Sequence, residues 1–215
     1  MRYRDLGTLE GPVLLFGGPY SNVQALTALW EEAEARRIPA ARMICTGDVV
    51  AYCGAPARTV AQIRQLGCPV VAGNCEIQLG QGALDCGCGF EEGSACDLLS
   101  IGWFSHASAA LPAADKAWMA TLPDVLTFTH HGSRYAVIHG GVTDVARFIW
   151  PVSEDAAFFR GMGGGGAVGR AGRSRHCGPF RHPLSEGPAT GTVDQCRGDR
   201  NAAARRPRDH LLCAA

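Results

Sequence analysis

Short apolar runs alternate with amphipathic stretches through residues 1–75. The runs at 12–16, 42–46 and 69–72 have the length and apolar content of buried strands. The stretches between them place apolar residues at helical spacing, and Pro56 stands at the favoured first position of the second one. This order of strand, helix, strand, helix and strand is typical of a parallel α/β sheet with right-handed crossovers. We therefore predict an α/β fold.

The chain after residue 75 is less regular until residue 113. We expect a helix at 113–122 and two strands at 125–129 and 135–139, joined as a hairpin through 130–134. His130 and His131 fall in that connection, where we expect both to be exposed. A further helix is predicted at 152–160.

The length, net charge and hydropathy of the chain argue against some classes of protein. The chain has 215 residues, enough for one domain with a sizeable core, and a formal net charge of +0, which argues against a dedicated nucleic-acid binder. No apolar run is long enough to cross a bilayer. Asp5 and Glu10 precede the first apolar run, unlike the basic start of a signal peptide. We expect a cytoplasmic protein with no membrane partner.

The composition changes at residue 161. Residues 161–215 contain nine arginines, no lysine and few large apolar side chains, and four consecutive glycines occupy 163–166. Such a segment has too little apolar surface to offset the entropy lost on ordering. We divide the chain into a domain at 1–160 and a Gly/Arg-rich tail at 161–215. The tail is interpreted as disordered or as the product of a frameshift in a GC-rich gene.

Polar residues follow three of the expected strands directly: Asp48, Asn74 and His139. Open α/β sheets carry their chemistry at the carboxyl ends of strands. Carboxylate, carboxamide and imidazole groups suit Mn, Fe, Zn or Mg, so these residues are candidate metal ligands. Each also has a structural alternative: Asp48 as a helix cap or loop residue, Asn74 as a turn residue and His139 as a packed strand-end histidine.

The motifs GDVVAYCGAP (47–56), GNCE (73–76) and HGG (139–141) occur in an order that resembles the calcineurin-like metallophosphoesterases, and among them the small bacterial phosphodiesterase-like branch. The resemblance covers residues 12–160. It implies a two-sheet sandwich flanked by helices, in four layers α/β/β/α, and metal-dependent hydrolysis of phosphomonoesters or phosphodiesters. It also implies that Asp48, Asn74 and His139 bind metal, and that Asn74 and the residue at position 75 take part in catalysis.

Several positions depart from the family pattern. Gly18 stands where the family has a metal-binding Asp, Tyr20 where it has a His, and Cys75 where it has the His that assists the leaving group. The closing Gly-His-x-His motif is absent. We therefore expect one divalent metal ion or none. The alternative function is a catalytically inactive phosphoesterase-fold protein that binds a phosphate, a nucleotide or a protein; a small phosphate ester or nucleotide is the expected ligand.

Further candidates lie outside the three strand ends. Tyr20, Asn22 and His106 are predicted cleft or substrate contacts, with Tyr20 offering a hydroxyl to a bound anion. The chain has ten cysteines, which we expect to be reduced. Cys75 is either a buried thiol or a replacement metal ligand. A thiolate metal site formed by Cys75, Cys86, Cys88 and Cys96 is a third, separate hypothesis.

Overall fold

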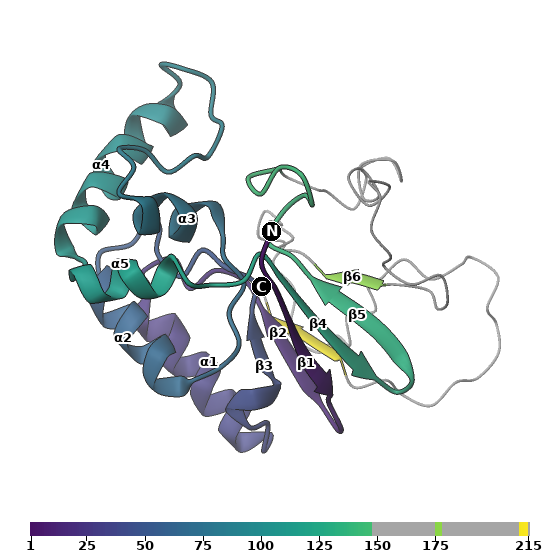
Figure 1. The fold of residues 1–215 in the computed structure, drawn as a ribbon. Coiled ribbons are helices and arrows are strands. Elements are labelled where there is room, and N and C mark those ends of the chain that lie inside the picture. The colour runs from purple at the N-terminus through teal and green to yellow at the C-terminus, as the bar shows by residue number, and fades with distance from the viewer. Residues whose placement is uncertain (148–174, 178–210, 215) are drawn as a thin grey trace.

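The structure is a computed structural model that describes residues 1–147, 175–177 and 211–214 (Figure 1). The helices are α1 (Val23–Ala35), the short 3-10 helix η1 (Ala40–Arg42), α2 (Pro56–Leu66), α3 (Asn74–Gln81), α4 (Ala95–Ala110) and α5 (Ala113–Met119). The strands are β1 (Tyr3–Thr8), β2 (Val13–Phe16), β3 (Met43–Cys45), β4 (Val125–His130), β5 (Ser133–Val137), β6 (Arg175–Cys177) and β7 (Leu211–Ala214).

The first sheet has the order β3-β2-β7 and contains only parallel pairs. Leu15 of β2 pairs with Ile44 of β3, in the parallel arrangement predicted for these two strands. The third predicted strand, at 69–72, joins the edge of β3 through a bridge between Cys45 and Val70. The Cys45 N–H donates to Pro69 O at 2.9 Å, and the Val71 N–H donates to Cys45 O at 2.9 Å. The predicted parallel pairing is confirmed.

The second sheet has the order β1-β4-β5-β6. The predicted hairpin is present as the antiparallel pair β4 and β5, in which Phe128 is opposite Tyr135 and their rings stack at 5.0 Å between centroids. β1, which runs parallel to β4, was not expected. Most of its residues are exposed, so the apolar run that identified the other strands is missing there.

Residues of β2 alternate between two cores. Val13 and Leu15 belong to a buried cluster with Phe128 and Val137 of the second sheet. Leu14 and Phe16 belong to a larger cluster built mainly from the helices and the loops between them. Helices therefore cover one face of the first sheet and the second sheet covers the other, as Figure 1 shows. The described part of the chain forms α/β/β layers, which confirms the predicted α/β sandwich class.

The expectations for the two histidines, the later helices and the tail have different outcomes. His130 is 1% exposed, and its Nδ1 lies 2.8 Å from Leu9 O, so its predicted exposure was wrong; His131 is exposed as expected. α4 was not predicted, because the helix is apolar nearly all round and has no clear polar face. The helix predicted at 152–160 lies outside the described residues. Within the predicted tail, β6 pairs with β5 and β7 pairs with β2.

Candidate metal centre

Three loops bring Asp48, Asn74 and His139 together. Asp48 follows β3, Asn74 is the first residue of α3 after the segment at 69–72, and His139 follows β5. Gly47 allows this approach because its φ is +98° and a Cβ there would lie 2.7 Å from His139 Nδ1 and 2.8 Å from Gly73 N. All three side chains are at least nine-tenths buried. The structure therefore brings the three candidate ligands together, and their binding of a metal stays a prediction.

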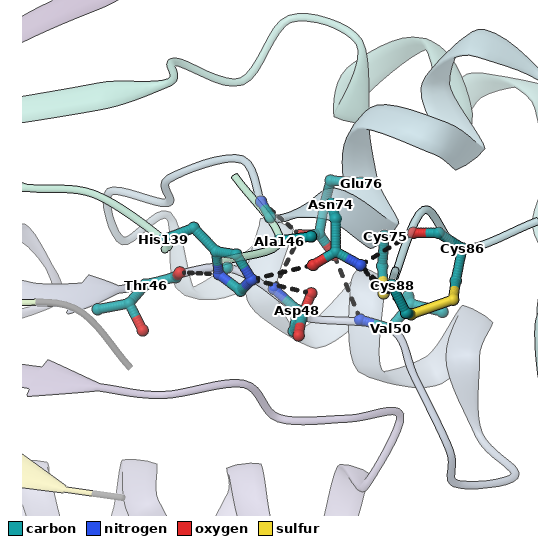
Figure 2. A network of polar contacts seen from close by, with 12 residues as sticks. Thr46, Asp48, Val50, Asn74, Cys75, Glu76, Cys86, Cys88, His139 and Ala146 are labelled. Atoms are coloured by element: carbon teal, nitrogen blue, oxygen red, sulfur yellow. Dashed lines mark hydrogen bonds and ion pairs between the residues drawn. A yellow bond between two sulfur atoms is a disulfide. The ribbon is translucent and has the colours of Figure 1, made fainter. Parts of the chain in front are cut away.

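His139 connects the other two residues. Its Nδ1 lies 2.7 Å from Thr46 O. A carbonyl oxygen only accepts hydrogen bonds, so Nδ1 carries the proton, and in the neutral ring Nε2 carries a lone pair. His139 Nε2 lies 3.2 Å from Asn74 Oδ1 and 3.5 Å from Asp48 Oδ1. In the neutral ring, Nε2 and these two oxygens are all lone-pair donors that converge at one point (Figure 2), whereas a protonated ring would donate from Nε2 to Asn74 Oδ1 and pair with the Asp48 carboxylate.

This donor set fits one divalent metal ion. Two ligands that are each about 2.1 Å from a metal, at octahedral or tetrahedral angles, lie about 3.0–3.4 Å apart. The distances from Nε2 to the two oxygens, 3.2 and 3.5 Å, are close to that range. The Nδ1 contact with a backbone carbonyl is the usual way in which a metal-binding histidine is oriented. Within the described residues, no three His, Cys, Asp or Glu side chains are placed to hold a metal, so the set depends on the Asn74 carboxamide.

The Asn74 carboxamide is oriented from its nitrogen side. Asn74 Nδ2 donates to Cys86 O at 2.9 Å, and two sulfur atoms lie farther away, Cys88 Sγ at 3.5 Å and Cys75 Sγ at 3.6 Å. Because every neighbour of the nitrogen is an acceptor, the carboxamide oxygen faces His139, as Figure 2 shows. The loop that follows α3 thus determines which end of the carboxamide faces the centre.

Glu76 was not among the predicted site residues. One carboxylate oxygen, Oε2, accepts from Asp48 N at 2.8 Å and from Gly73 N at 2.9 Å, and Oε1 lies 3.4 Å from Val50 N. Glu76 is fully buried, and burial, followed by the charge of Asp48, raises its pKa to about 7. It joins the loops that carry Asp48 and Asn74. The sequence signal was a Glu three residues after the residue that precedes a helix, a common N-terminal pattern.

Gly18, where the resemblance implies a metal-binding Asp, lies in a closely packed part of the chain. Gly18 supplies no ligand, and a Cβ at this residue would lie 2.7 Å from Tyr20 Cε1, 2.8 Å from Asp48 O and 2.9 Å from Asp48 Cβ. The surrounding loops are joined by backbone bonds, from Tyr20 N to Asp48 O at 3.1 Å and from Ser21 N to Val49 O at 2.9 Å. Tyr20 and Asp48 both have positive φ, at 52°. Tyr20 and Asp48 therefore occupy the space that a side chain at position 18 would need.

The remaining predicted residues lie around the centre or away from it. Cys75 is next to Asn74 and 1% exposed. The half-buried Tyr20 packs against Gly18 and stacks at a tilt on Tyr52, with 5.3 Å between ring centroids. Asn22 caps α1, with its Oδ1 accepting from Ala25 N at 3.0 Å. His106 is exposed on α4. Their predicted contacts with a substrate stay predictions.

Two cysteine expectations were wrong. Cys86 and Cys88 form a disulfide, so they are not the reduced thiols that were expected. In this state their sulfur atoms cannot serve as thiolate ligands with Cys75 and Cys96, and Cys96 is an exposed thiol at the start of α4. The thiolate metal site is therefore not formed in this structure. Sequence spacing alone could not distinguish a disulfide from a metal site.

Comparisons with known proteins support the fold. No protein-family model matches the chain, and no curated protein matches it. Among solved structures, a hypothetical protein from Pyrococcus horikoshii OT3 is 17% identical with a TM-score of 0.56, covering 68% of this chain. The match spans 62% of the length of that protein, less than two thirds. A metallophosphoesterase from Sphaerobacter thermophilus is 18% identical with a TM-score of 0.44, covering 65% of this chain and 52% of its own.

None of the helices in the described residues is long and apolar enough to cross a membrane. The layered sheets and the likeness to the Pyrococcus protein support the predicted α/β sandwich, and at 17% identity that likeness is one of fold alone.

Proposed function

We propose that the chain binds one divalent metal ion and, with its help, a small phosphate ester or nucleotide, without efficient hydrolysis. The observation that carries the proposal is the convergence of Asp48 Oδ1, Asn74 Oδ1 and His139 Nε2. A bound divalent ion supplies positive charge that offsets the charge of a phosphate group. Asp48 contributes the negative charge of the ligand set, while the Asn74 carboxamide and the His139 ring contribute neutral donors.

Two observations favour binding over hydrolysis. Gly18 and Tyr20 stand where the resemblance implies an Asp and a His, so a carboxylate and an imidazole are missing from the implied metal site, and Asp48 packs against Gly18. Cys75 stands in place of the histidine that assists the leaving group and is 1% exposed, which leaves no accessible acid at that position. Each missing group removes charge stabilisation or proton transfer from the expected reaction.

Calorimetry with Mn²⁺ tests the proposal, because Mn²⁺ prefers oxygen and nitrogen ligands over thiolates. We expect one ion per chain, and loss of binding in Asp48→Asn and His139→Ala. His131→Ala is the matched control, since His131 is exposed in the β4–β5 connection. Inorganic phosphate and AMP should bind more tightly with Mn²⁺ present. Absence of Mn²⁺ binding, or equal binding by Asp48→Asn, would contradict the proposal.

Hydrolysis is the second candidate function, favoured by the retention of three family ligand positions in one place. Turnover of bis-p-nitrophenyl phosphate with Mn²⁺ distinguishes the two. The binding proposal expects no turnover above background. Turnover that disappears in Asp48→Asn and persists in His131→Ala would establish the hydrolase instead.

A further inference from the structure

The Cys86–Cys88 disulfide lies beside the candidate metal centre, separated from His139 by the Asn74 carboxamide (Figure 2). The three groups are in line: the disulfide loop contacts Asn74 Nδ2, and Asn74 Oδ1 faces His139 Nε2. Neither the fold nor the proposed function requires a disulfide here. Because the disulfide loop contacts the nitrogen of the Asn74 carboxamide, it helps to orient a candidate metal ligand.

We propose that Cys86 and Cys88 form a reversible redox modification site that controls metal affinity through the orientation of Asn74; the inference rests on the metal site of the proposed function. In the disulfide form, Cys86 O accepts from Asn74 Nδ2 at 2.9 Å and Cys88 Sγ lies 3.5 Å from the same nitrogen. These contacts hold the carboxamide with its oxygen toward the metal position.

Breaking the disulfide releases this orientation. The two thiols no longer hold residues 86 and 88 at their present Cα separation of 5.3 Å, and the loop that contains them has exposed residues on both sides, at 84–85 and 89. Once Cys86 O moves, the Asn74 carboxamide can rotate, and a rotated carboxamide presents N–H groups instead of a lone pair to a cation. Loss of a contact that orients a ligand costs about 10–100-fold in metal affinity.

The redox step needs a dithiol reductant. A thiolate of that reductant attacks the sulfur of Cys88, the half-buried residue of the pair, and Cys86, which is 3% exposed, leaves as a thiolate. The second thiol of the reductant then attacks the mixed disulfide and releases Cys88. The cysteines gain two electrons and two protons, and the reductant becomes a disulfide.

The test compares Mn²⁺ affinity of the oxidised chain with that of the chain reduced by tris(2-carboxyethyl)phosphine, a non-thiol reagent that performs the same two-electron reduction. Titration of thiols in denaturant confirms a gain of two. We expect the dissociation constant to rise about 10–100-fold on reduction. Far-ultraviolet circular dichroism in both states controls for unfolding.

Variants isolate the role of Asn74. Cys86→Ser/Cys88→Ser should bind Mn²⁺ as the reduced chain does, with or without reductant, whereas Cys96→Ser, at an exposed thiol, should retain the redox difference. Asn74→Asp has two equivalent oxygens, so its affinity should not depend on redox state. Equal affinity of the oxidised and reduced wild-type chains would overturn this inference alone. No Mn²⁺ binding in either state would overturn the proposed function and this inference with it.

Discussion

Gly18→Ala tests whether the space beside Gly18 is closed by packing. The new Cβ would lie 2.8 Å from Asp48 O and 2.9 Å from Asp48 Cβ, both shorter than normal van der Waals contacts, and 2.7 Å from the Tyr20 ring. The ring could move, but the two loops are held together by bonds from Cys53 N to Tyr20 O and from Ala55 N to Ser21 O, each 3.1 Å. Overpacking of this kind costs about 1–3 kcal/mol.

Urea denaturation followed by tryptophan fluorescence measures the change. A loss of about 1–3 kcal/mol lowers the folding equilibrium constant about 5- to 150-fold. Gly17→Ala is the matched control, because a Cβ at the neighbouring glycine meets nothing within 4 Å; its free energy of unfolding should change by less than about 1 kcal/mol. Equal stability of Gly18→Ala and Gly17→Ala would refute the closed-site reasoning.

Three further predictions concern the same loops. Gly18→Asp, which introduces the residue that the resemblance implies, should still bind no more than one Mn²⁺ by calorimetry, because the added side chain would collide with Asp48; two bound ions would contradict this. Glu76→Ala should lower the free energy of unfolding in urea by about 1–3 kcal/mol, since it leaves the two buried amides that donate to Glu76 Oε2 without that acceptor. The exposed Glu31→Ala should have little effect, and equal effects of the two substitutions would show that the Glu76 contacts matter little. The Glu76 pKa is raised from 4.5 to about 7 in the folded state. The proton on Glu76 should therefore stabilise the fold most below pH 4.5, and this stabilisation should fall as the pH rises to about 7. Urea titrations across that range should show the free energy of unfolding decline, and the same decline in Glu76→Gln would assign it to another group.

The fold was predictable where local patterns agreed with packing. Val23 to Ala33 lie on helix α1, and the Pro56 start of α2 is present, because an apolar stripe and a first-position proline act locally. Helix α4 was not predicted because it lacks an amphipathic pattern: Ile101, Trp103 and Phe104 place apolar side chains on several sides of it. β1 escaped because its exposed residues carry no apolar pattern.

The candidate site was predictable only in part. Asp48 and Asn74 follow neighbouring parallel segments of the first sheet, which places them at one edge. His139 follows β5 of the second sheet, so its approach depends on how the two sheets pack. Glu76 lies within a motif already singled out, yet its bonds to two loops depend on tertiary structure. The burial of His130 against Leu9 O depends on β1, which was itself missed.

Anomalous X-ray diffraction from crystals of the oxidised chain soaked in Mn²⁺ would locate the metal directly. We predict one anomalous peak per chain, about 2.0–2.3 Å from Asp48 Oδ1, Asn74 Oδ1 and His139 Nε2. No peak among these three atoms, or a second peak beside Gly18, would contradict it.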